Sequence, residues 1–139
     1  MTQEDKNLLL QDLCGRLPYG VKGNYQNSDD ELLRKVTIMY RYLEPNGMVM
    51  TGDIKPYLFP LSSMTEEQKK ELDKKFNVIA IYGNNILIHY HSQGYWDTDL
   101  EVDFQDWLWL INWLNKNHFD YRGLIEKDLA FDATGLNIY

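Results

Sequence analysis

Residues 103–117, with the sequence DFQDWLWLINWLNKN, carry the strongest structural signal in this chain. Asp103 is a typical N-cap residue and is followed three positions later by Asp106, so we expect a helix from about residue 104 to 117. At about 100° per residue, one broad arc of this helix is apolar and is predicted to face the core. That arc holds Phe104, Trp107, Leu108, Leu110, Ile111 and Leu114.

Trp109 and Trp113 lie on the opposite side of the same helix, one turn apart. Leaving two indole rings in water is unfavourable, so something is expected to cover them. Either a later segment of the chain folds over them, or they contact another protein chain. The candidate residues of that later segment are Leu124, Ile125, Leu129 and Phe131.

Two more helices and two hairpins are expected before this helix. Thr2 and Thr65 each begin a capping box, which predicts helices at 2–14 and about 66–76. Apolar residues alternate from residue 36 to 42 and a Glu-Pro-Asn-Gly turn follows, which predicts a β-hairpin at 34–51. Residues 78–91 are predicted to form a second hairpin, and residues 124–130 a short last helix.

Helices at both ends of the chain around two hairpins indicate an α+β fold in a single domain, residues 1–139. Short turns join the predicted strands, so the sheet is expected to be antiparallel. An open sheet and a sheet curled into a small barrel both satisfy this pattern.

Composition excludes several classes of protein. The chain has 139 residues, a formal net charge of −7 and a sequence pI of about 4.8, which argues against binding to nucleic acid or to anionic lipid. Cys14 is the single cysteine, so we expect no internal disulfide and a buried, reduced thiol. No leader-like segment or membrane-spanning run is visible. These features predict a cytoplasmic protein.

His89 and His91 are candidate metal ligands. They lie two positions apart on a predicted strand, so both imidazoles would project from one face of the sheet. Neutral imidazole suits Zn or Fe, but a third ligand would be needed. Asp97, Asp99 and His118 are the candidates for it, and none lies at a diagnostic spacing.

Acidic residues alternate between residues 97 and 103 without a basic residue among them. Asp97, Asp99 and Glu101 are candidates for contact with a basic partner. The spacing resembles the start of a calcium-binding loop, but Val102 and Leu108 replace the glycine and the bidentate glutamate that such a loop requires. An EF-hand is therefore excluded.

Catalytic and nucleotide-binding motifs are absent from the sequence. It has no nucleophile elbow, no phosphate loop, no dinucleotide-binding glycine motif and no zinc-protease motif, so we expect no cofactor. The sequence favours a non-enzymatic protein-interaction module. The alternatives are a metal-dependent enzyme that uses His89 and His91, and an acidic decoy for a nucleic-acid-binding protein.

Three segments resemble a family of small uncharacterised proteins from gut anaerobic bacteria and their phages or mobile elements. They are LLLQDLCGRLPYGVK at 8–22, IKPYLFPLSSMTEEQKKEL at 54–72 and WLNKNHFDYRGLIEKDLA at 113–130. The resemblance implies a shared scaffold and a bacterial or phage setting. It implies no activity, cofactor or catalytic residue.

The segment HFDYR at 118–122 joins the long helix to the last predicted helix. Its aromatic residues are expected to pack into the core as a corner of the fold. Arg122 is expected to pair there with Asp120 or Glu126.

Overall fold

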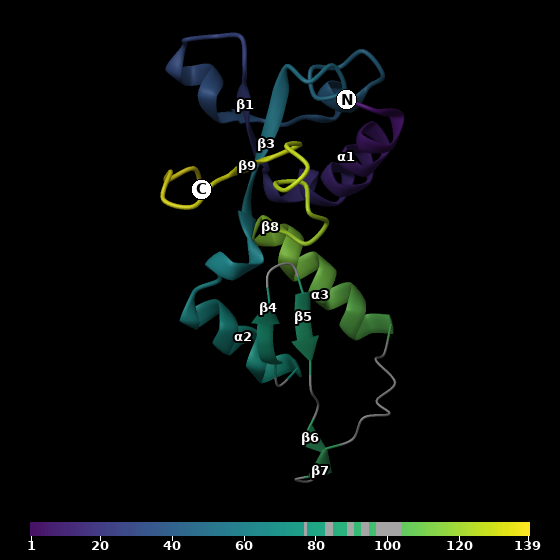
Figure 1. The fold of residues 1–139 in the computed structure, drawn as a ribbon, viewed down its shortest axis with the longest axis vertical. Coiled ribbons are helices and arrows are strands. Elements are labelled where there is room, and N and C mark those ends of the chain that lie inside the picture. The colour runs from purple at the N-terminus through teal and green to yellow at the C-terminus, as the bar shows by residue number, and fades with distance from the viewer. Residues whose placement is uncertain (77, 83–84, 89–90, 93–94, 97–103) are drawn as a thin grey trace.

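Figure 1 shows the computed structural model of the chain, which describes the backbone of residues 1–76, 78–82, 85–88, 91–92, 95–96 and 104–139. Side chains are described for residues 1–76 and 104–139. The structure confirms the α+β class, since it combines three α-helices in the described residues with a five-stranded open sheet. The helices are α1 (Gln3–Arg16), α2 (Glu66–Phe76) and α3 (Phe104–Lys116).

Both predicted capping boxes are present. The Asp5 backbone N–H donates to the Thr2 hydroxyl (3.1 Å), and the Thr2 N–H donates to the Asp5 carboxylate (2.8 Å). Thr65 and Gln68 make the same reciprocal pair at the start of α2, at 2.9 and 3.2 Å. The start of each helix follows from local chemistry, because these side chains satisfy backbone groups that have no partner within the helix.

Strand β3 (Ile54–Pro60) is the centre of the main sheet. Its first half pairs antiparallel with β1 (Lys22–Tyr25), and β1 pairs antiparallel with β2 (Val36–Thr37). Its second half pairs in parallel with β8 (Phe119–Asp120) and β9 (Phe131–Asp132). The sheet is therefore mixed rather than wholly antiparallel, and it does not close into a barrel.

The predicted hairpin at 34–51 is wrong. Its Glu-Pro-Asn-Gly turn forms, with the Gly47 N–H donating to the Glu44 carbonyl (2.7 Å), but the flanking residues do not pair as strands. A 3₁₀ helix, η3 (Tyr40–Leu43), and further turns occupy this region. Ile38 and Val49 are buried outside any strand, and their backbone groups are still paired: the Ile38 N–H donates to the Val21 carbonyl (2.9 Å) and the Val49 N–H to the Tyr42 carbonyl (3.1 Å).

The second predicted hairpin forms. Strands β4 (Val78–Tyr82) and β5 (Asn85–Ile88) pair antiparallel in a separate two-stranded sheet. A further short ladder joins β6 (His91–Ser92) to β7 (Tyr95–Trp96).

Turns replace the predicted last helix at 124–130. Asp128 adopts a left-handed backbone conformation with φ of 57°, which interrupts helical geometry. The first helix also differs from its prediction, because it continues through Gly15 to Arg16. An added Cβ at Gly15 would lie 2.9 Å from the Asn115 side-chain nitrogen, so this glycine allows α1 and α3 to approach closely.

Two apolar cores lie toward the two ends of β3 (Figure 1). The first core lies between α1 and the main sheet and includes Leu13, Val49, Leu58 and Leu124. The second core lies between α2 and α3 and includes Leu61, Leu72, Phe76, Leu110, Trp113, Leu114 and Phe119. No helix in the described residues is long and apolar enough to span a membrane.

Candidate functional site

The two tryptophans expected to need a cover belong to the second core. The Trp109 and Trp113 rings are stacked, with centroids 6.3 Å apart, and Phe119 stacks on Trp113 at 5.8 Å. Phe76 of α2 packs edge-on against Trp109 at 5.5 Å. Trp113 is 7% exposed, and its indole N–H donates to the Glu71 carboxylate (2.8 Å).

The predicted cover by Leu124, Ile125, Leu129 and Phe131 is wrong, whereas contact of the half-buried Trp109 with another chain stays a prediction. Helix α2 and Phe119 cover them, whereas Leu124 and Leu129 of the later segment belong to the first core. Trp113 is buried within its own chain and is not open to a partner.

The predicted core face of α3 is wrong for its first half. Phe104 is 83% exposed, Trp107 48% and Leu108 58%, although Leu110 and Leu114 are buried as expected. Large apolar residues lie on two sides of the helix, with Gln105, Asn112 and Lys116 between them, so its sequence alone does not determine which apolar side the rest of the chain covers.

Phe104, Trp107 and Leu108, together with the half-buried Ile111, form the α3 apolar face. These positions have the spacing i, i+3, i+4 and i+7, which places them along one side of a helix. The face begins at the first turn of α3. Asp106, in the same turn, forms an ion pair with Lys75 of α2 (3.3 Å), which ties this end of the helix to the second core.

Several predicted site residues lie outside the described part of the chain. Asp97, Asp99, Glu101 and His89 are among them, and His91 is described only by its backbone in β6. Among the described residues, no group of three His, Cys, Asp or Glu side chains could hold a metal ion. The thiol of Cys14 is exposed on α1, so the prediction of a buried thiol is wrong.

A groove of about 460 Å³ lies between α1 and the turns that follow η3. Lys6 and Leu10 line it from α1, and Tyr40, Glu44 and Pro45 line it from the opposite side. Leu10 and Tyr40 are exposed, at 39% and 68%. The two charged side chains of the lining, Lys6 and Glu44, have opposite signs.

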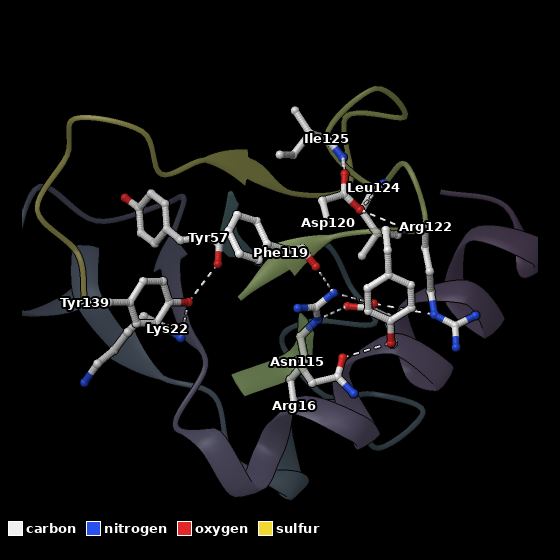
Figure 2. A network of polar contacts seen from close by, with 12 residues as sticks. Arg16, Lys22, Tyr57, Asn115, Phe119, Asp120, Arg122, Leu124, Ile125 and Tyr139 are labelled. Atoms are coloured by element: carbon white, nitrogen blue, oxygen red, sulfur yellow. Dashed lines mark hydrogen bonds and ion pairs between the residues drawn. The ribbon is translucent and has the colours of Figure 1, made fainter. Parts of the chain in front are cut away.

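A buried ion pair connects α1 to the segment that follows α3 (Figure 2). Asp12 and Arg16 are both 0% exposed and form two hydrogen bonds, of 2.6 and 2.9 Å. Arg16 also donates to the Phe119 carbonyl (2.7 Å). The Arg122 guanidinium lies 3.5 Å from Asp12, so this arginine pairs with Asp12 rather than with Asp120 or Glu126 as expected.

The Asp120 carboxylate organises the turn beyond β8. It is 1% exposed and accepts hydrogen bonds from the backbone N–H groups of Arg122 (3.3 Å), Leu124 (3.0 Å) and Ile125 (2.9 Å). A buried carboxylate is stable only with such partners. The hydrogen bonds and ion pairs of Asp12 and Asp120 are thus all internal to the chain.

His118 and Tyr139 form a ring-stacking contact. Their rings stack with centroids 3.6 Å apart and planes 9° apart. Burial, with a smaller contribution from the charge of Arg16, lowers the pKa of His118 to about 4. Although the Tyr139 residue as a whole is 42% exposed, burial around its hydroxyl raises its pKa to about 12. Both groups are therefore neutral near pH 7, and sequence reasoning identified neither as part of a shared contact.

No protein-family model matches the chain, and no curated protein or solved structure shows significant similarity to it.

Trp113→Ala is expected to lower the free energy of unfolding by about 3–5 kcal/mol, because it removes a buried aromatic side chain from the second core. Urea denaturation followed by far-UV circular dichroism measures the change. Trp107→Ala is the matched control and should change stability by less than about 0.5 kcal/mol, since this ring is exposed. Equal losses for the two variants would contradict the assignment of Trp113 to the core.

Arg16→Leu is expected to cost about 3–5 kcal/mol, because it leaves the Asp12 carboxylate buried without its main partner. The double variant Asp12→Leu with Arg16→Leu should cost less than the sum of the two single variants. Urea denaturation of Arg16→Leu, Asp12→Leu and the double variant gives the coupling free energy between the two side chains. Strict additivity would show that the two side chains do not act as a pair.

His118 makes stability depend on pH. Its pKa is about 4 in the folded chain and 6.5 in an unfolded chain, so the unfolded state binds the proton more tightly. Above pH 6.5 the histidine is neutral in both states and does not lower the free energy of unfolding. As the pH falls from 6.5 toward 4, protonation of the unfolded state progressively lowers that free energy. His118→Phe should flatten the fall in unfolding free energy between pH 6.5 and 5, measured by denaturation across pH. An unchanged slope would contradict the lowered pKa.

Proposed function

We propose that this chain is a non-enzymatic protein-interaction module that presents the α3 apolar face to a protein partner. The exposure of Phe104 (83%), Trp107 (48%) and Leu108 (58%) on one side of a single helix carries the proposal. Leaving large apolar side chains grouped in water is unfavourable, and burying them against a partner recovers that free energy. Aromatic side chains also account for much of the binding energy at protein interfaces.

The spacing of these residues suits one mode of recognition. Amphipathic helices that enter a hydrophobic groove use anchors at i, i+3, i+4 and i+7. Phe104, Trp107, Leu108 and Ile111 have this spacing. The pairing of Trp113 with Glu71 and the packing of Trp109 on Phe76 hold the opposite side of α3, so the helix would meet the partner already formed. A preformed helix reduces the ordering cost of binding.

The partner that fits is a protein with an apolar groove and a basic rim. The sequence has acidic residues at 97, 99, 101, 103 and 106, and its next basic residue is Lys116. Complementary charge at the rim of an interface speeds association and selects the partner. Asp97, Asp99 and Glu101 enter this proposal by their charge in the sequence alone.

The buried charged side chains Asp12, Arg16 and Asp120 bond only to groups of their own chain. We therefore assign them a structural role and place the interaction surface on α3. The resemblance of three segments to proteins of gut bacteria, phages and mobile elements extends the proposal to its setting. We place the chain in the cytoplasm of such a bacterium, as an accessory protein of a mobile element or phage.

The triple variant Phe104→Ser, Trp107→Ser and Leu108→Ser is expected to lose partner binding. Purified wild-type and variant proteins are used as bait in host lysate, and the affinity of the captured protein is then measured by calorimetry. Loss of one central aromatic anchor costs about 2 kcal/mol or more, so the triple variant should bind at least about thirtyfold more weakly.

The matched control carries three serines at exposed apolar positions elsewhere, Leu32, Tyr40 and Leu136, which are 82%, 68% and 50% exposed. It should bind like the wild type, and both variants should keep a native far-UV spectrum. Raising the salt concentration should weaken binding, because the partner's rim is basic. Unchanged binding by the triple variant would refute the proposed surface. A wild-type dimer that only the triple variant abolishes would identify a second copy as the partner.

A further inference from the structure

The ring of Tyr139 occupies a defined slot formed by residues that are distant in sequence (Figure 2). Its hydroxyl donates to the Tyr57 carbonyl (2.7 Å) and accepts from the Lys22 backbone N–H (3.0 Å). The His118 ring stacks on one side of it at 3.6 Å, and the Phe59 ring lies 5.8 Å away at 53°. We call this the tyrosine slot.

The slot recognises a phenol through more than apolar contact. It supplies one acceptor and one donor to the same hydroxyl, from the backbones of the neighbouring strands β3 and β1. Backbone groups in a sheet are held in place, so their geometry does not depend on flexible side chains. A phenylalanine would stack equally well on His118 but would leave both backbone groups without the hydroxyl.

The segment that carries Tyr139 is only lightly attached elsewhere. The Ala133 N–H donates to the Leu58 carbonyl (2.8 Å), which is the last backbone hydrogen bond to β3 before Tyr139. Residues 134–137 are exposed, and Gly135 and Asn137 have left-handed backbones with φ of 75° and 52°. Lys35 contributes an exposed hydrogen bond to the Asn137 carbonyl (3.0 Å). Ile138 is half-buried, and the Thr134 and Leu136 N–H groups bond only to the adjacent Asp132 and Ala133, so the Tyr139 side chain makes the main hydrogen-bonded anchor of residues 134–139, which we call the strap.

We propose that the tyrosine slot is a binding site for a tyrosine side chain presented on a peptide, which the chain fills with its own Tyr139 and which can accept the strap of a second copy. Detachment of the strap breaks the interactions of Tyr139 and a few exposed bonds, while the two cores remain intact. A terminal segment held in this way can exchange between copies by domain swapping, because the strap of one molecule forms in its neighbour the same interactions that it made in its own chain. This site is separate from the α3 apolar face.

The test uses the full chain with Tyr139→Ala, which leaves the slot open, and a peptide of residues 133–139, ATGLNIY, as the probe. The peptide should bind the variant saturably, with NMR shifts at Lys22, Phe59 and His118. The same peptide ending in phenylalanine should bind about tenfold more weakly or worse, since it lacks the hydroxyl. Wild-type protein, whose slot is filled, should not respond to either peptide.

Three results would overturn the proposal: a folded Tyr139→Ala variant that does not bind, equal affinity for the two peptides, or equal binding by the wild type. Should the variant unfold, hydrogen exchange of the wild type decides. The Lys22 amide, bonded to Tyr139, should exchange at least about tenfold faster than the Ile38 amide, bonded to the Val21 carbonyl, because the strap opens without global unfolding. Equal protection of the two amides would refute a detachable strap.

Discussion

The burial of Arg16 is the constraint on which the rest of the structure depends. A fully buried guanidinium is unstable unless charged and polar partners surround it. Asp12 supplies one from the preceding turn of α1, but the Phe119 carbonyl lies 103 positions away in the chain. The hydrogen bond from Arg16 to Phe119 therefore forms only when α1 has docked against the segment that follows α3. That docking also brings Gly15 against Asn115 and places Arg122 beside Asp12, so the two segments adopt a single arrangement.

The buried apolar residues of the fold form two separate cores. Leu58 of β3 belongs to the first core, and Leu61, just after this strand, belongs to the second. Helix α3 serves the second core with Leu110, Trp113 and Leu114 and leaves its first turns uncovered. The same helix is thus a structural element at one end and an exposed apolar surface at the other. The tyrosine slot is built from β1, β3 and His118, so the two proposed contact sites do not compete for the same residues.

Local signals in the sequence predicted local structure well. The caps at Thr2 and Thr65, the bounds of α2 and α3 and the turn at Gly47 depend on neighbouring residues, and all are present. Several predictions that required tertiary knowledge were wrong. Alternation between residues 36 and 42 predicts a hairpin, although Val36 and Thr37 pair with β1 instead, Ile38 enters the first core, and Tyr40 is 68% exposed at the start of η3. The exposed side of α3 could not be assigned because both sides are apolar. The i, i+4 spacing of Asp12 and Arg16 was a visible signal of their pairing, but nothing local indicated that the pair would be buried.

The pairing order of β3 has a consequence for synthesis on the ribosome. Phe59 pairs with Phe119, and Tyr57 pairs with Phe131, so this central strand leaves the ribosome long before two of its neighbours are translated. During that interval β3 is paired only with β1 at residues 54–56, and residues 57–60 still lack their partners β9 and β8. Unpaired strand edges in nascent chains are points where aggregation begins. A nascent chain of this protein therefore completes its main sheet only when residue 132 is free.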